Sequence, residues 1–203
     1  NFVSGAGVGS PRVYANMGVT NNLAMVATDF TGGSWIKFAS IDTGVNQTII
    51  IMDRGGYNTT AGVGAGHYAF TLYKNTSDNW QLGFQSGDGV TNSTGQTTFS
   101  NWNLQDGSWH HLGYNFDYNA ASDNVVTFWL DGVDVGSANL SVNITSGSTD
   151  SITRRFTAGE RATSSYYTHF NGSMDDVFVT TGLHDFQAVP EPGAIALLFL
   201  SGG

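Results

Sequence analysis

Acid–base chemistry in this chain depends on aspartate, because Glu160 and Glu191 are the two glutamates among 16 acidic residues. Hydrolysis of a glycosidic bond needs two carboxyl groups on opposite sides of the sugar, one as acid and one as nucleophile or base. Asp131 and Asp134 are three positions apart across an expected turn, so they do not share a strand face. Asp175–Asp176 would point to opposite faces of a strand. We therefore expect no catalytic residues and predict that the protein is not an enzyme.

The five histidines are poorly placed to bind a metal together. His110 and His111 are adjacent, and neighbouring residues on a strand point in opposite directions, so they cannot chelate one ion. His67, His169 and His184 are isolated from other ligand types. The chain has no cysteine, which excludes a thiolate site. We expect structural roles for these side chains.

Calcium is the cofactor that the sequence supports best. Asp53, Asp88 and Asp106 lie in expected loops that contain glycine, and carboxylate oxygens are the ligands that Ca²⁺ prefers. The same residues also suit turns that hold no ion, because aspartate hydrogen-bonds its own backbone there. Calcium binding and turn formation therefore both remain open for these three residues.

Four aromatic residues in or near expected loops are candidates for binding a sugar ring: Trp80, Trp102, Tyr166 and Tyr167. Packing in the core or at a subunit contact explains each of them equally well.

The charge of the chain argues against nucleic acid as a partner. The formal net charge is −9 at pH 7, and Arg154–Arg155 is the nearest approach to a basic cluster. A phosphate backbone would be repelled by such a protein.

The elements that must position these residues are short strands. The chain is rich in glycine and contains 13% aromatic residues, a composition typical of strands and turns. Asp131-Gly132 between alternating apolar residues indicates a hairpin. Residues 1–20 are weakly patterned and suit an N-terminal arm or an edge strand. We predict strands over 22–27, 34–39, 47–52, 68–73, 80–84, 109–116, 125–130, 133–135, 155–158 and 173–179, which form an all-β sandwich or barrel.

Four motifs in a fixed order resemble those of laminin G-like, concanavalin A-like domains: Gly107-Ser108-Trp109-His110-His111, Trp129-Leu130-Asp131-Gly132, Phe156-Thr157-Ala158-Gly159 and Phe170-Asn171-Gly172-Ser173-Met174-Asp175-Asp176-Val177. The resemblance implies a two-sheet antiparallel jelly-roll sandwich over residues 21–186. It also implies a calcium ion at the rim of the sandwich, and in hydrolases of this fold a pair of glutamates on one strand, which this chain lacks.

The C-terminal segment, residues 187–203, is the most apolar part of the chain. Val189, Pro190, Glu191 and Pro192 precede it and resemble the PEP-CTERM sorting signal of exported Gram-negative proteins, which an exosortase recognises. Seven apolar residues follow Gly193, whereas a membrane-spanning helix needs about twenty. The alternative is that this segment is a last strand or helix of the core. The resemblance places the protein outside the cell or on its outer surface.

These observations lead to two hypotheses for function. The first is a non-catalytic structural subunit of an extracellular matrix, sheath or filament, self-associating into a homo-oligomer or polymer through its arm, its tail and its sheet edges. The alternative is a calcium-assisted lectin or adhesin that binds polysaccharide at the cell surface. The sequence favours the first.

Overall fold

The computed structural model is an antiparallel β-sandwich, and the predicted all-β jelly-roll fold is confirmed. The residues that it describes are 2–5, 12–19, 25–39, 46–54, 57–58, 62–63, 65–77, 79–88, 91–99, 102–145, 155–159 and 170–186. These ranges contain strands, turns and loops but no helix, so none of them forms an apolar helix of membrane-spanning length. The candidate sorting residues 189–192 lie outside the described residues, and the sorting signal stays a prediction.

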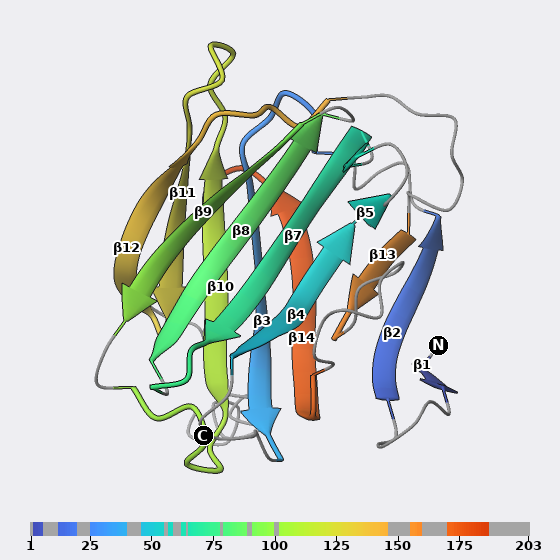
Figure 1. Ribbon diagram of the computed structural model, residues 1–203, viewed down its shortest axis with the longest axis vertical. Helices are drawn as coiled ribbons and strands as arrows, with labels where there is room; N and C mark the ends of the chain where they lie inside the picture. Colours follow the sequence, from blue (N-terminus) through green and yellow to red (C-terminus); the bar gives the residue numbers. More distant parts are fainter. Residues whose placement is uncertain are drawn as a thin grey trace, which may run out of the picture.

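The larger sheet has seven strands and faces the viewer in Figure 1. Every neighbouring pair in it is antiparallel. The segment predicted as an arm or edge strand supplies its first two strands. In spatial order the sheet consists of β1 (Phe2–Gly5), β2 (Arg12–Val19), β13 (Arg155–Ala158), β4 (Gln47–Arg54), β7 (Ala65–Lys74), β8 (Trp80–Asp88) and β9 (Asn92–Phe99).

The smaller sheet has five strands and lies behind the first (Figure 1). A separate two-stranded ribbon joins β5 (Tyr57–Asn58) to β6 (Gly62–Val63). In spatial order the five-stranded sheet consists of β12 (Val133–Leu140), β11 (Asn124–Leu130), β10 (His110–Asp117), β3 (Phe30–Phe38) and β14 (Gly172–Thr181).

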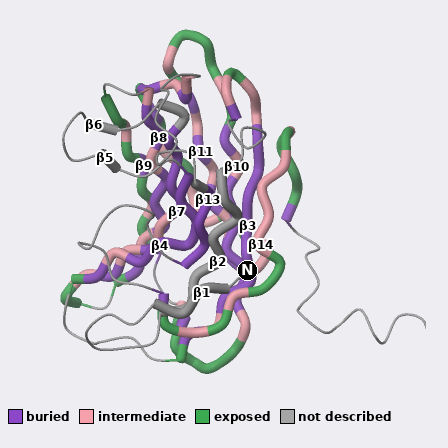
Figure 2. Tube along the Cα trace, turned by 90° about the vertical axis from the view of Figure 1, so that its right-hand side faces the viewer, coloured by how far each residue is buried: buried purple, intermediate pink, exposed green. Residues whose placement is uncertain are grey.

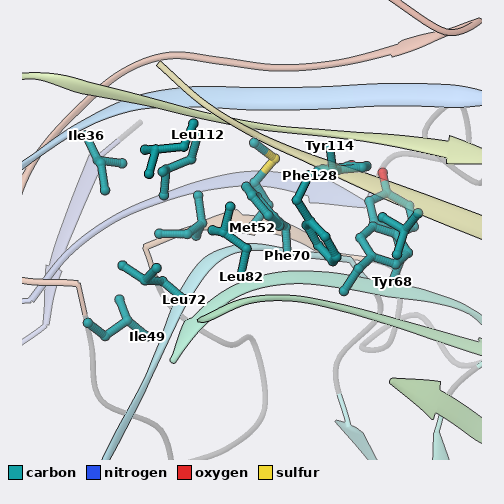
Figure 3. Packing of buried hydrophobic residues seen from close by; sticks show 14 of the residues in the cluster. Ile36, Ile49, Met52, Tyr68, Phe70, Leu72, Leu82, Leu112, Tyr114 and Phe128 are labelled. Atoms are coloured by element: carbon teal, nitrogen blue, oxygen red, sulfur yellow. The ribbon is translucent and has the colours of Figure 1, made fainter. Parts of the chain in front are cut away.

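The core forms where apolar residues at alternate positions of both sheets meet, because successive side chains on a strand point to opposite faces. In the larger sheet the register pairs Phe70 with Phe84 and Leu72 with Leu82, and all four are fully buried. Buried residues line the interior between the two layers in Figure 2, and Figure 3 shows side chains of both sheets pointing toward one another. The side chains that alternate with these point to the outer faces of the two sheets.

Two strand predictions differ from the structure. Residues 22–27 were expected to form a strand, but the described part of this segment is a turn in which Met25 and Ala27 have positive φ angles of 44° and 51°. Strand β9 was missed, because its sequence Asn-Ser-Thr-Gly-Gln-Thr-Thr-Phe is polar and typical of a loop. It is a strand because Gly95, Thr97 and Phe99 face the other sheet, while Thr94, Gln96 and Thr98 alternate with them and face solvent.

Candidate functional site

The outward face of the seven-stranded sheet carries ordered rows of amide and hydroxyl side chains. In one row, running across four strands, Thr98 pairs with Gln81, Gln81 with Tyr73, and Tyr73 with Thr48. The Gln81 Nε2 donates a hydrogen bond of 2.8 Å to Thr98 Oγ1, which holds the amide in place. The Tyr73 hydroxyl donates to Asn46 Oδ1 at 3.1 Å.

A second row crosses the same four strands, four residues from the first row along β7, β8 and β9. It joins Thr94, Gln85, Ala69 and Asp53 by direct register, and Gln85 Nε2 donates to Thr94 Oγ1 at 3.3 Å. Between the two rows lies Gly83, where a Cβ would come within 2.6 Å of Thr71 Oγ1 and 3.5 Å of Gln96 Cγ.

We call this surface the amide face and define it by six partly or fully exposed side chains: Tyr73, Gln81, Gln85, Thr94, Gln96 and Thr98. Each amide offers two N–H donors and one acceptor oxygen, and each hydroxyl offers a donor and an acceptor. Such an array complements a ligand that is itself covered with hydroxyl groups.

At the β4 end of the second row, Asp53 forms a buried pair with a histidine. His67 Nε2 lies 3.1 Å from Asp53 Oδ1, and both side chains are fully inaccessible to solvent. The prediction that Asp53 lies in a loop is wrong, because it occupies β4 and pairs across to Ala69 and Thr157. A buried charge is retained when it is paired and hydrogen-bonded, so this pair stabilises the edge of the face.

A second cluster of titratable groups lies at one end of the sandwich. His110 Nδ1 is 2.8 Å from Asp131 Oδ2, and its Nε2 is 3.2 Å from Asp106 Oδ1. A carboxylate only accepts, so both contacts are hydrogen bonds when the imidazole carries two protons. Hydrogen bonding to Asp131, followed by the attraction of both carboxylates, therefore raises the pKa of His110 above 6.5. A hydrogen bond from the Ser108 backbone N–H lowers the pKa of Asp106 below 3.8.

The adjacent His111 has the opposite environment, as expected for neighbours on a strand. It points to the outer face of the five-stranded sheet, where its ring contacts Trp35, Phe178 and Phe186 at centroid distances of 5.3, 6.4 and 5.3 Å. Burial among these rings lowers its pKa to about 4. The prediction that the two histidines do not act together on one ion agrees with this arrangement.

The calcium candidates do not converge in the described structure. Asp88 ends β8 and accepts hydrogen bonds from the backbone and hydroxyl of Thr91 at 2.7 and 3.1 Å, whereas Asp106 is in the loop before β10. In Figure 1 the end of β8 and the start of β10 lie at opposite ends of the sandwich. Asp53 is paired with His67. Within the described ranges, no three His, Asp or Glu side chains are grouped so as to hold a metal ion. Calcium binding stays a prediction.

The aromatic sugar-binding candidates are also dispersed. Trp80, for which a sugar site and core packing both remained open, is 5% exposed and stacks on Phe38 in the core at a centroid distance of 5.9 Å. Trp102 is half-buried and packs against the core. Tyr166 and Tyr167 lie outside the described residues. The amide face itself was not predicted. The signal for it in the sequence was a pair of glutamines four residues apart, Gln81 and Gln85, which share one face of a strand.

Comparison with known proteins agrees with the β-sandwich fold. The profile of the concanavalin A-like lectin/glucanases superfamily matches residues 13–182. The chain belongs to this superfamily. The superfamily match begins within β2 and ends just after β14, so it includes the five-stranded sheet and all of the seven-stranded sheet after the start of β2. No curated protein matches the chain in sequence.

Solved structures share the superfamily fold at low sequence identity. The enzymatically active domain of tailspike protein 2 from bacteriophage CBA120 has a TM-score of 0.56 and 13% identity, with 87% of this chain and 25% of that chain covered. The binding domain of botulinum neurotoxin DC, solved with rat synaptotagmin II, has a TM-score of 0.51, 12% identity and coverage of 91% and 40%. An endo-β-1,4-glucuronan lyase from the fungus Trichoderma reesei has a TM-score of 0.48, 15% identity and coverage of 92% and 88%. The chain thus spans about a quarter of the tailspike chain.

The prediction that the protein is not an enzyme is wrong as drawn, because the tailspike domain that shares this superfamily fold is enzymatically active. The prediction relied on the shortage of glutamate. That shortage argues against one mechanism, the pair of glutamates, but catalysis depends on particular side chains and not on fold or composition. Superfamily membership includes both lectins and glucanases.

Proposed function

We propose that this protein binds polysaccharide through the amide face of its seven-stranded sheet. The observation that carries the proposal is the pair of cross-strand hydrogen bonds, Gln81 to Thr98 and Gln85 to Thr94, that holds two glutamine amides in register on an exposed sheet. Side chains that are already ordered lose less entropy when a ligand binds. The lectin and glucanase members of the superfamily support a carbohydrate ligand.

The strands give this face the rigidity that a binding site requires. Beneath it, Phe70, Leu72, Leu82 and Phe84 are fully buried and packed against the second sheet. Sites built on strands hold their side chains more precisely than sites on loops. Because adjacent strands are about 4.8 Å apart, a row that crosses four strands is roughly 15 Å long and suits an extended polymer.

The experiment is binding of the purified protein to a panel of insoluble and soluble polysaccharides, with Gln81→Ala/Gln85→Ala as the test variant. Gln105→Ala is the matched control, because Gln105 is an exposed glutamine in the loop before β10 and does not belong to the face. Loss of two hydrogen bonds of about 1 kcal/mol each should weaken binding by at least roughly tenfold. Unchanged binding by the double variant would show that the site lies elsewhere, and binding to no polysaccharide would reject the function.

Two further measurements on the same samples address calcium and catalysis. Binding is compared in the presence of calcium and of a chelator, and a loss with chelator would support the calcium-assisted lectin that the sequence suggested. Release of reducing ends is followed as well, because superfamily members include glucanases. Product release from a polymer that the face binds would extend the function from binding to cleavage.

The structural subunit predicted from the sequence stays a hypothesis, and no contact between described residues supports it. Strand β14 is an edge of the five-stranded sheet, but its pairing is interrupted between Asp175 and Phe178, and the exposed Asp176 has a φ angle of 47°. A bulge and two exposed carboxylates on an edge strand oppose pairing with a second sheet. Export, the outer-surface location and recognition of the PEP-CTERM-like segment by an exosortase are likewise part of the proposal, and a fluorescent fusion localised in the native host tests them.

A further inference from the structure

The amide face is uncharged in the described part of the chain. Alternation along β4, β7, β8 and β9 places threonine, glutamine, asparagine, tyrosine, alanine, isoleucine and glycine on it, together with two titratable residues near one corner. These are Asp53 and His67, which are fully buried and paired with each other at 3.1 Å. No ionised side chain among these residues therefore reaches the surface that a ligand would contact.

In the larger sheet, the cations whose side chains the structure describes are directed away from this face. Arg54 and Lys74 alternate with Asp53 and Tyr73, and they are 3% and 1% exposed. Lys37 belongs to β3 in the other sheet and pairs with Ser173 of β14. Guanidinium and ammonium groups form the strong, charge-assisted hydrogen bonds by which proteins hold carboxylate and sulfate groups. None of these three can supply such a bond to a ligand on the amide face.

The charge of the whole chain acts in the same direction. With 7 basic and 16 acidic residues, the formal net charge is −9 at pH 7. A polymer of uronic acids or sulfated sugars would be repelled during approach and would gain no compensating ion pair at the face. A neutral polymer is not repelled and needs no ion pair, because its hydroxyl groups exchange hydrogen bonds with water for hydrogen bonds with the amides of the face.

We propose that the polysaccharide bound by the amide face is neutral, a polymer of hydroxyl-bearing sugars without carboxylate or sulfate groups. This inference rests on the proposed function, because it assigns the class of ligand to that same site. It distinguishes this chain from polymer-binding sites that select uronates through arginine or lysine.

The test uses pairs of polymers that differ only in charge, such as β-1,4-glucan with β-1,4-glucuronan and β-1,4-mannan with β-1,4-polymannuronate. We expect at least one neutral member to bind roughly tenfold or more tightly than its carboxylate partner. We also expect its affinity to change less than about twofold between low and high salt, because no ion pair is screened. Tighter binding of the carboxylate member, equal binding of both, or binding that salt abolishes would overturn the inference while leaving polysaccharide binding intact. Binding of neither member of any pair would overturn the proposed function, and this inference with it.

A charge-introducing variant localises the preference to the face. Gln81→Lys places an ammonium group within the first row, and Gln105→Lys adds the same charge in the loop before β10. If the neutral surface sets the preference, Gln81→Lys should raise affinity for the carboxylate polymer several-fold more than Gln105→Lys does. Equal gains from both variants would show that net charge, and not the amide face, controls selection.

Discussion

The ring of Phe186 lies directly on Gly113, in the middle of the outer face of the five-stranded sheet. A Cβ at position 113 would be 2.8 Å from the Phe186 ring, so the contact requires glycine. Trp129 and Phe178 flank the ring at centroid distances of 5.8 and 6.2 Å, and Phe186 is 2% exposed. The segment after β14 is therefore part of the folded domain, although the superfamily match ends at residue 182.

Replacing Phe186 with alanine should strongly destabilise the domain. The substitution removes a buried ring and leaves a cavity above Gly113, a change that typically costs about 3–5 kcal/mol. Urea denaturation followed by tryptophan fluorescence measures the loss. Leu183→Ala is the control, because Leu183 is in the same segment and 49% exposed, and its effect should stay below about 0.5 kcal/mol. Equal effects of the two variants would contradict the anchoring role of the ring.

Gly113→Ala should destabilise through a clash and not through lost burial. The added methyl group meets the Phe186 ring, and overpacking of this kind costs about 1–3 kcal/mol. In the Phe186→Ala background the same substitution should be nearly neutral, since the obstructing ring is gone. A double-mutant cycle by chemical denaturation measures this coupling. Additive effects would mean that Gly113 is required for another reason.

The pKa values of the two adjacent histidines should lie on opposite sides of the usual value of 6.5, that of His110 above it and that of His111 below it. The hydrogen bond to Asp131, with the additional attraction of Asp106, raises the pKa of His110, whereas burial among aromatic rings lowers the pKa of His111 to about 4. The native state thus stays neutral at His111 between pH 6.5 and about 4, where the unfolded chain gains a proton. Stability from this residue falls as the pH drops through that window. Two-dimensional NMR of the imidazole protons resolves both curves, and similar pKa values for the pair would reject the assignment.

Asp131→Asn should return the pKa of His110 toward 6.5. Asparagine tolerates the φ angle of 49° at this position and keeps an oxygen that can accept the 2.7 Å hydrogen bond from the His111 backbone N–H. What it removes is the charge that raises the pKa of His110. The stability that this pair contributes is fully present below pH 6.5 and is lost as the pH rises through the folded pKa. The variant should therefore lose most stability, about 1–3 kcal/mol, in mildly acidic buffer and less at alkaline pH. An equal loss of stability in mildly acidic and in alkaline buffer would mean that Asp131 acts by shaping its turn and not through the charge of His110.

Asp53→Asn separates stability from ligand binding on the larger sheet. Asp53 and His67 are fully buried, so the substitution should destabilise the domain, by about 3–5 kcal/mol if the pair is fully broken. Because neither side chain reaches solvent, affinity for a polysaccharide should change less than about twofold at temperatures where the variant is folded. Isothermal titration calorimetry, with circular dichroism to confirm folding, measures both. A large loss of affinity in the folded variant would place this pair in the binding site.

The central strands could be predicted from sequence because their signals are local. Alternation of apolar residues marked β7, β10 and β11, and Asp131-Gly132 marked the hairpin between β11 and β12. The polar strand β9 gave no such signal, because its strand conformation depends on hydrogen bonds to β8 and on contact with β12. The sequence left the position of Trp80 open for a related reason, since a tryptophan beside a loop can turn to the surface or to the core, and packing against Phe38 decides for the core.

The amino-acid sequence alone determined the all-β class, the order of the motifs and the acidic charge, because alternation, turn residues and composition are properties of neighbouring positions. The tertiary structure decided which side chains come together. Gln81 meets Thr98, Asp53 meets His67 and Phe186 covers Gly113 only once the strand order and register are set. Register depends on hydrogen bonds between segments far apart in the chain, and a shift of one residue would turn every side chain to the other face. A local pattern encodes that choice only where a tight turn such as Asp131-Gly132 joins two strands.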